Sequence, residues 1–124
     1  MERMMKILVV EDDVLQSSWL EAKLADRGHC VRVASDGDTA LARWKKHSPF
    51  DIVITDFRYP GKTIRNGLDL IAAVRSIDPL QAFVVQTAER NLTAPFGVKV
   101  LSKPYPIQRL LRLIKVPVHP TATP

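Results

Sequence analysis

The sequence predicts an α/β domain in which a parallel β-sheet is covered by helices on both faces. Segments 6–10 (KILVV) and 51–55 (DIVIT) are almost continuous apolar runs, which is typical of strands buried on both faces. Segments with the apolar spacing of helices separate the strand-like runs, and repeated β-α units of this kind build parallel sheets with right-handed crossovers. A chain of 124 residues is long enough for one such domain with a single core.

Five segments are predicted to be strands. Segment 30–34 (CVRVA) alternates apolar and polar residues, which is typical of a strand at the edge of a sheet. Its cysteine, Cys30, is the only one in the chain, and we expect it to be a small buried apolar residue. The predicted strands are 6–10, 30–34, 51–55, 82–86 and 98–102.

Four segments are predicted to be helices. Asp13 is the expected N-cap of the first, and Gly28 follows its C-terminal end. Either Asp36 or Asp38 opens the second, while the third and fourth carry apolar residues at intervals of three and four. The predicted helices are 14–27, a segment that follows Asp36 or Asp38, 67–77 and 107–115.

The composition excludes several classes of protein. The single cysteine rules out a disulfide framework and suits the reducing cytoplasm, where we expect this protein. No apolar run could span a bilayer, so we expect no membrane insertion. The net charge is +5, but no nucleic-acid-binding motif accompanies it, and we expect no DNA binding by this domain. His29 and His47 have no nearby ligand set, and both are expected at the surface.

The last nine residues differ in character from the rest. They contain three prolines and show no apolar periodicity. We therefore expect the domain to occupy residues 1–115 and the segment 116–124 to be a disordered tail or a linker. The start of the chain is compatible with a stand-alone protein or with the N-terminal domain of a longer one.

Polar and charged residues follow the predicted strands at their carboxyl ends, which is where ligands bind in open α/β sheets. Glu11 and Asp12 follow the first strand, Asp56 the third, Thr87 the fourth and Lys103 the fifth. All five are predicted to meet at one edge of the sheet. Clustered carboxylates repel one another, so they indicate either a solvated turn or a site for a hard divalent cation such as Mg²⁺ or Mn²⁺.

The same set of residues suits phosphoryl transfer. An aspartate can act as a nucleophile and form an acyl phosphate. The hydroxyl of Thr87 and the ammonium of Lys103 can hold the phosphoryl oxygens. The work of the protein is then mostly positioning and neutralisation of charge.

Four segments also resemble the signature segments of response-regulator receiver domains from two-component signalling. They are ILVVEDD, DIVITDFRYP, QTA and LSKPY, in that order, within residues 6–115. The resemblance implies a flavodoxin-like, doubly wound sheet with strand order 2-1-3-4-5. It implies that Asp56 accepts a phosphoryl group from a histidine kinase or a histidine phosphotransfer protein, and that the domain then switches its binding of a downstream protein.

The resemblance implies roles for the other residues of the site as well. On this register Asp12, Asp56 and the backbone carbonyl of Arg58 bind Mg²⁺, and Glu11 acts on the metal through water. Thr87 and Lys103 contact the phosphoryl group. A domain of this kind catalyses only its own phosphoryl transfer and dephosphorylation, so we expect a signalling domain and not an enzyme with a separate substrate.

One departure from the family pattern lies after Asp56. Six residues, 61–66 (GKTIRN), separate Pro60 from Gly67, where the family usually has about half as many. The insertion brings two cations, Lys62 and Arg65, close in sequence to Arg58. These charges belong either to a solvated surface loop or to a group that holds phosphate and screens the site from water.

A second departure lies between Thr87 and Lys103. Only fifteen residues separate them, so we expect the family's fourth helix to be shortened or absent, as it is in a subgroup of receivers known from alphaproteobacteria. Val100 stands where the family usually has a switch aromatic, and the nearby Tyr105 and Phe96 are expected to pack in the core or at its rim. We expect phosphorylation to act on the loop 88–97 instead.

One contact is expected beside the site. Glu89 is expected to pair with Arg58 across the unphosphorylated site.

Other functions are alternatives to a phosphorylated switch. The main alternative is a receiver-like module that binds partners constitutively, because the aromatic and the fourth helix are missing. A magnesium-dependent phosphatase is a third reading, but Arg58 stands where such an enzyme needs a second acid. Nucleotide binding is disfavoured because neither glycine-rich phosphate motif occurs.

Overall fold

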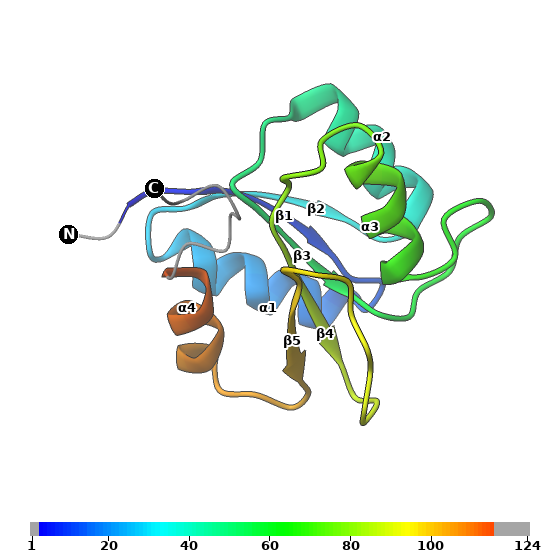
Figure 1. Cartoon of the computed structure of the whole chain (residues 1–124). Coiled ribbons are helices and arrows are strands. Elements are labelled where there is room, and N and C mark those ends of the chain that lie inside the picture. Colours follow the sequence, from blue (N-terminus) through cyan, green and yellow to red (C-terminus); the bar gives the residue numbers. More distant parts are fainter. Residues whose placement is uncertain (1–2, 116–124) are drawn as a thin grey trace.

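The computed structural model describes residues 3–115 and contains the predicted parallel sheet (Figure 1). Its strands lie in the order β2-β1-β3-β4-β5, so the predicted flavodoxin-like order is confirmed. Each strand begins and ends within one residue of the predicted bounds. The strands are β1 (Lys6–Val10), β2 (Cys30–Ala34), β3 (Ile52–Asp56), β4 (Phe83–Thr87) and β5 (Lys99–Ser102).

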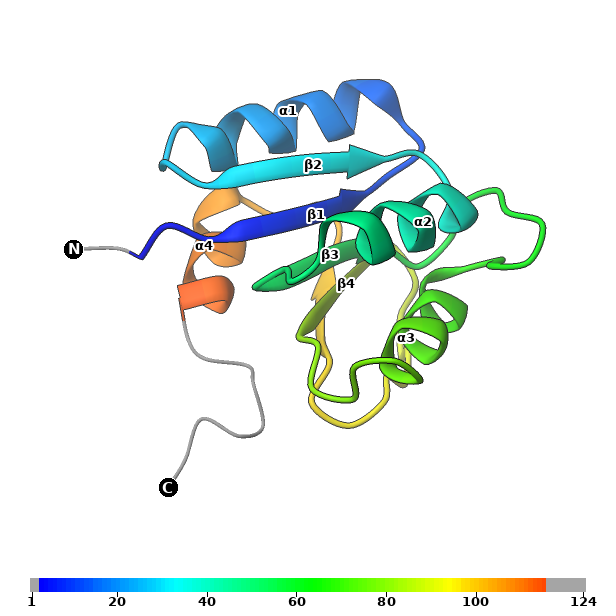
Figure 2. The ribbon, with the colours of Figure 1, turned by 90° about the horizontal axis from the view of Figure 1, so that it is seen from above.

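Helices cover both faces of the sheet, which explains the continuous apolar runs of its inner strands. Two helices pack on each face (Figures 1 and 2). Alternate residues of β1 therefore enter different cores, with Leu8 and Val10 in one and Ile7 and Val9 in the other. One face carries α1 (Val14–Ala25) and α4 (Ile107–Lys115), and the other carries α2 (Gly37–His47) and α3 (Gly67–Arg75).

Side-chain caps fix where the first three helices begin. The Asp13 carboxylate accepts from the backbone N–H of Leu15 at 2.9 Å, which confirms its predicted role at the start of α1. Asp36, not Asp38, caps α2, because its carboxylate accepts from the Thr39 N–H at 2.7 Å. Asn66 caps α3 in the same way. The cap of α3 therefore belongs to the insertion that precedes this helix.

The insertion 61–66 is bound to the domain. The carboxylate of Asp38 accepts from the backbone N–H groups of Lys62, Thr63 and Ile64 at 2.7–3.3 Å. The side chain of Ile64 is 6% exposed and packs against Gly37, where a Cβ atom would lie 2.5 Å from it. Lys62 and Arg65 are exposed. The exposure of these two cations agrees with a solvated surface loop, although the backbone beneath them is fixed, and a role in holding phosphate stays a prediction.

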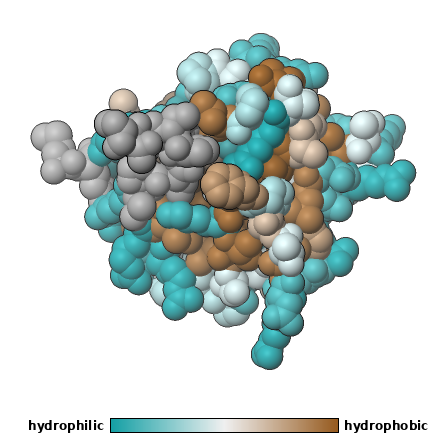
Figure 3. Space-filling model, viewed as in Figure 1, coloured by the Kyte–Doolittle hydropathy of each residue, from teal (hydrophilic) through white to brown (hydrophobic). Residues whose placement is uncertain are grey.

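The connection between β4 and β5 contains no helix, so the shortened or absent fourth helix is confirmed (Figure 1, yellow). The Arg75 guanidinium of α3 donates to the Phe96 carbonyl at 2.8 Å and holds the far end of this connection. Hydrophobic side chains show at the surface over β4 and β5, between α3 and α4 (Figure 3). Val100 of β5 is 39% exposed there.

Three expectations about single residues were wrong. Cys30 is exposed, because the alternation of the edge strand β2 turns it outward together with Arg32. His29 is buried, because its Nδ1 accepts from the backbone N–H of Met5 at 3.0 Å beside the start of β1. The side chain of Phe96 is 87% exposed, so this aromatic does not pack in the core or at its rim.

Two remaining expectations concern the C-terminal tail and insertion into a membrane. The proposed tail 116–124 lies outside the described residues, as do residues 1 and 2. Within residues 3–115, no helix is both long enough and apolar enough to cross a bilayer.

Candidate functional site

The predicted site residues meet at the carboxyl edge of the sheet. Asp56 and Thr87 are the last residues of β3 and β4, and Glu11 and Lys103 directly follow β1 and β5. All the strand pairs are parallel, so these ends lie side by side (Figure 2). The backbone N–H of Lys103 also donates to the Thr87 carbonyl at 2.8 Å, which fixes the lysine against the end of β4.

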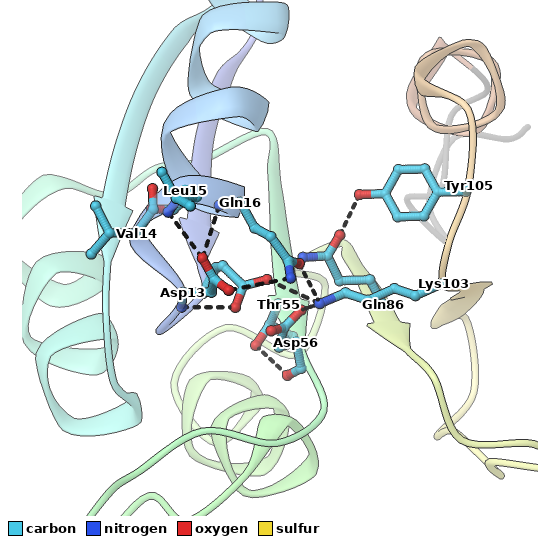
Figure 4. A network of polar contacts seen from close by, with 11 residues as sticks. Asp13, Val14, Leu15, Gln16, Thr55, Asp56, Gln86, Lys103 and Tyr105 are labelled. Atoms are coloured by element: carbon cyan, nitrogen blue, oxygen red, sulfur yellow. Dashed lines mark hydrogen bonds and ion pairs between the residues drawn. The ribbon is translucent and has the colours of Figure 1, made fainter.

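Lys103 joins the two buried carboxylates of the site. Its Nζ lies 2.8 Å from Oδ1 of Asp56 and 3.0 Å from Oε1 of Glu11, so one ammonium bridges β1 and β3 (Figure 4). The same Nζ donates to the amide oxygen of Gln16 in α1 at 3.1 Å. The side chain of Lys103 is only 22% exposed, so its charge is directed into the site. Sequence reasoning missed Gln16.

Three carboxylates form a cluster around the ends of β1 and β3. Oxygens of Glu11, Asp12 and Asp56 all lie within 4.8 Å of one another. Glu11 and Asp56 are buried, whereas Asp12 is exposed and gives the cluster an open side. Asp13 stays outside the cluster as the helix cap, as predicted. Oδ1 of Asp56 is buried, and the ammonium of Lys103 lies 2.8 Å from it.

Burial and neighbouring charges set the protonation of this cluster. Burial, and after it the carboxylate of Glu11, raises the pKa of Asp56 to about 7 against the opposing effect of Lys103. Burial alone would raise the pKa of Glu11, but contacts with Asp56, the Asp13 N–H and Lys103 lower it. Burial alone would lower the pKa of Lys103, but the two carboxylates raise it. Without a cation, Asp56 is therefore the carboxyl group that takes a proton near neutral pH.

The residues present fit a hard divalent cation. Carboxylate oxygens are the ligands that Mg²⁺ prefers, and the cluster offers them from two strands. Two of the carboxylates are buried and share one ammonium, that of Lys103, so a divalent cation would offset the negative charge that remains in the cluster. Arg58, the remaining predicted ligand, follows β3 and pairs with Asn66 through a short antiparallel bridge.

Thr87, Glu89 and Arg58 form a chain of contacts beside the cluster. The hydroxyl of Thr87 is buried and accepts from the backbone N–H of Glu89 at 2.9 Å. The carboxylate of Glu89 accepts from Nε of Arg58, so the predicted pair is confirmed. The side chain of Arg58 is 74% exposed and that of Glu89 38% exposed. The pair therefore lies at the solvent boundary.

A cavity of about 360 Å³ opens beside the cluster, between α1 and the segment that follows β5. Trp19 and Leu20 line it from α1, and Tyr105 lines the opposite side. The Tyr105 hydroxyl donates to the amide oxygen of Gln86, the residue before Thr87 (Figure 4). Burial raises the pKa of Tyr105, so this hydroxyl keeps its proton. This hydrogen bond connects β4 to the segment before α4. In the sequence, only the polar Gln86 after the apolar residues 83–85 could have indicated such a contact.

Gly67 holds α3 close to the end of β3. A Cβ atom at this position would lie 2.5 Å from the carbonyl oxygen of Asp56. The backbone N–H of Gly67 donates to the Phe57 carbonyl at 2.7 Å. Only glycine allows this approach, so Gly67 positions the segment that carries Asp56. Sequence reasoning used Gly67 to mark the end of the insertion and the start of a helix, and did not foresee its close contact with Asp56.

Comparisons with known proteins agree with the fold. The family profile of the response regulator receiver domain matches residues 7–115. The chain is 30% identical to the DNA-binding transcriptional regulator NtrC of Azospirillum brasilense, with 95% of this chain and 25% of that protein aligned. It is 36% identical to the two-component response regulator PhoP of Pseudomonas aeruginosa, with 70% of this chain and 37% of that protein aligned.

A solved structure shows the same similarity in three dimensions. The chemotaxis response regulator CheY4 of Vibrio cholerae matches with a TM-score of 0.76 and 27% identity, and the match covers 90% of this chain and 97% of that one. The fold and the edge of charged residues define a signalling domain of the α/β class. This chain belongs to the family of response regulator receiver domains. It spans about a quarter to somewhat over a third of the length of the two curated relatives.

Proposed function

We propose that this domain accepts a phosphoryl group on Asp56 from a histidine kinase or a histidine phosphotransfer protein, and that the modification changes its binding of a downstream protein. The observation that supports this most is the convergence of three strands on one carboxylate. Lys103 lies 2.8 Å from Asp56, with Glu11 and Asp12 beside it. The proposed domain is residues 1–115, working in the cytoplasm, with 116–124 as a tail or linker.

The proposed reaction is an in-line displacement on phosphorus. A carboxylate oxygen of Asp56 attacks the phosphorus of a phosphohistidine, the bond from phosphorus to the imidazole nitrogen breaks, and an acyl phosphate forms while the imidazole leaves. Lys103 holds one phosphoryl oxygen by its ammonium, and Thr87 donates its hydroxyl to another. Because Lys103 already lies against Asp56, it needs little reorganisation to take up this role.

The proposed Mg²⁺ site is formed by Glu11, Asp12, Asp56 and the backbone carbonyl of Arg58. Asp12, Asp56 and the carbonyl would bind the ion, and Glu11 would hold one of its waters. The chemistry that a bound Mg²⁺ supplies is positive charge, which favours the ionised form of Asp56 and offsets charge on the phosphoryl oxygens. Asp12 is exposed, so this side of the cluster leaves room for an ion and its waters.

Phosphorylation with a small phosphodonor tests the proposal. Intact-mass measurement of the protein with acetyl phosphate and Mg²⁺ should show one phosphoryl adduct, and Asp56→Asn should show none. Asp26→Asn, an exposed aspartate after α1, is the matched control and should keep the adduct. Absence of an adduct from the parent would favour the alternative, a module that binds its partner constitutively. An unchanged adduct in Asp56→Asn would move the site to another residue.

A further inference from the structure

Three oxygens from three parts of the chain surround the ammonium of Lys103. Its Nζ donates to Oε1 of Glu11 at 3.0 Å and to the amide oxygen of Gln16 at 3.1 Å, and it lies 2.8 Å from Oδ1 of Asp56 (Figure 4). An ammonium carries three N–H groups, so the number of oxygens matches the number of donors. Two of these oxygens belong to carboxylates, and Gln16 supplies the uncharged one.

We propose that Gln16 is a positioning residue for phosphoryl transfer, which acts by holding the Lys103 ammonium in the direction of Asp56. The inference rests on the proposed function and adds to it a group that sets where the charge of Lys103 lies. Within residues 3–115, the hydrogen bonds of the Gln16 side chain go to Lys103 and Asp13. Gln16 therefore acts on the reaction through Lys103.

Gln16 closes a ring of hydrogen bonds at the start of α1. Glu11 accepts from Lys103 through Oε1 and from the backbone N–H of Asp13, at 3.1 Å, through Oε2. The Asp13 carboxylate accepts from the amide nitrogen of Gln16 at 3.5 Å. The amide oxygen of Gln16 then accepts from Lys103. The ring connects the N-cap of α1 to the ammonium that faces Asp56.

The neighbours of Gln16 determine which end of its amide faces Lys103. A carboxylate only accepts hydrogen bonds and an ammonium only donates them. A flipped amide would place its oxygen beside the Asp13 carboxylate and its N–H groups beside the ammonium, so both contacts would become repulsive. The contact with Asp13 is long and adds little energy, but it sets this direction. Asp13 therefore orients Gln16 in addition to capping α1.

The ammonium needs such a contact because there is open space beside it. Lys103 and Gln16 both line the cavity of about 360 Å³ between α1 and the segment after β5. Lysine has a long, flexible stem, so without a partner on this side its charge would also lie toward the cavity. An uncharged acceptor prevents this without adding a fourth carboxylate to a cluster whose charges already repel. A phosphoryl oxygen on Asp56 then meets an ammonium that is already in place.

Binding of beryllofluoride, a stable mimic of the phosphoryl group, tests the proposal on the intact chain. Gln16→Met keeps an unbranched, helix-forming side chain but removes the acceptor. With Mg²⁺ present, it should weaken the affinity for beryllofluoride about two- to tenfold. The affinity for Mg²⁺ alone should stay close to that of the parent. Fluorescence of Trp19, which lines the same cavity, reports both titrations. Gln108→Met, at an exposed glutamine of α4, is the matched control and should behave like the parent.

A second measurement observes Lys103 directly in the unmodified, metal-free protein. The ¹⁵N resonance of Lys103 Nζ, assigned by its loss in Lys103→Arg, should shift in Gln16→Met because one acceptor is removed. Asp13→Asn keeps a capping oxygen for α1 but places an N–H group beside the amide nitrogen of Gln16. It should turn the amide away and shift the same resonance. Added to Gln16→Met, Asp13→Asn should give no further shift.

The possible outcomes separate the role of Gln16 from a general structural effect. An unchanged Lys103 resonance in Gln16→Met would overturn the proposal. Equal losses of Mg²⁺ and beryllofluoride affinity would also overturn it, because they would show that the whole site is disturbed. A further shift in the double variant would overturn the orienting role of Asp13.

The outcomes also separate this inference from the proposed function. A phosphoryl adduct on Asp56, together with an unchanged beryllofluoride affinity in Gln16→Met, would overturn the role of Gln16 and leave phosphorylation standing. Failure of acetyl phosphate to give any adduct would refute the proposed function and the inference that rests on it, even if the Lys103 resonance shifts. A shifted resonance with a selective loss of beryllofluoride affinity would support the role of Gln16.

Discussion

Asp56 is 6% exposed and lies beside the carboxylate of Glu11, and this placement raises its pKa to about 7. The domain therefore keeps its proposed nucleophile in an environment that disfavours the charged form. Lys103 offsets part of that cost through its ion pair with Asp56. A bound cation would offset more, so the metal-free site is predicted to reduce the stability of the fold near neutral pH.

This predicts that the free energy of unfolding of Asp56→Asn depends on pH differently from that of the parent. In the unfolded chain an aspartate titrates near pH 4, whereas folded Asp56 titrates at about 7. Between these values the folded state binds the extra proton, so the stability of the metal-free parent falls as pH rises. Asparagine cannot titrate, so the gain from Asp56→Asn should grow by about 1–3 kcal/mol between pH 5 and pH 8.

Urea unfolding with a chelator present measures that difference. A gain that is the same at both pH values would contradict the burial and the neighbouring charge described for Asp56.

Asp12 allows a test of the metal site that is separate from Asp56. Mg²⁺ binds the folded state, so it should raise the melting temperature of the parent by mass action. Asp12→Ala should remove this shift and should stabilise the metal-free protein, because repulsion within the cluster is relieved. The neighbouring Asp13→Ala is the control. It should keep the Mg²⁺ shift but lose about 1 kcal/mol of stability with the cap of α1. A less stable metal-free Asp12→Ala would show that these carboxylates are structural.

Most of the site could be predicted at the scale of residues because each member follows a strand. Parallel strands end at one edge, so Glu11, Asp56, Thr87 and Lys103 had to meet. Gln16 could not be found in this way, because its contact with Lys103 depends on how α1 lies over the sheet. The residue patterns that predict strands say nothing about such contacts between elements.

At the scale of elements, the strands were predicted closely because burial on both faces leaves an unambiguous apolar run. The structure of the connections between strands and helices was harder to predict. The missing fourth helix followed from chain length alone, whereas the anchoring of 61–66 depends on backbone N–H groups that face Asp38. Phe96 was predicted to be packed because it is aromatic, but nothing in the sequence shows that its connection turns it outward.

The insertion gives a prediction at this scale. Asp38→Ala should remove the acceptor for the N–H groups of residues 62–64, so hydrogen exchange at those amides should rise severalfold. In the part of the chain that the structure describes, the hydrogen bonds of the Asp38 carboxylate go to residues 62–64, so the connection 88–97 serves as the internal reference. Exchange that stays slow at residues 62–64 would mean that the packing of Ile64 alone holds the loop.

At the scale of the whole molecule, the domain keeps one edge intact and alters two of the connections around it. The edge carries the acidic cluster with Lys103 paired to Asp56, and Thr87 ends the neighbouring strand. By the family resemblance the connection after β3 is longer than usual, and the connection between β4 and β5 contains no helix. We therefore expect the chemistry of the family at Asp56 and a different surface for its output, formed by 88–97 and its surroundings.

The most direct test of this account locates the phosphoryl group chemically. Borohydride reduces an aspartyl phosphate to homoserine, and peptide mass spectrometry then identifies the converted residue. After treatment with acetyl phosphate and Mg²⁺, the account predicts conversion at Asp56 and not at Asp12 or Glu11. Conversion at another residue, or no conversion in a protein that binds Mg²⁺, would contradict the proposal that Asp56 is the phosphoryl acceptor.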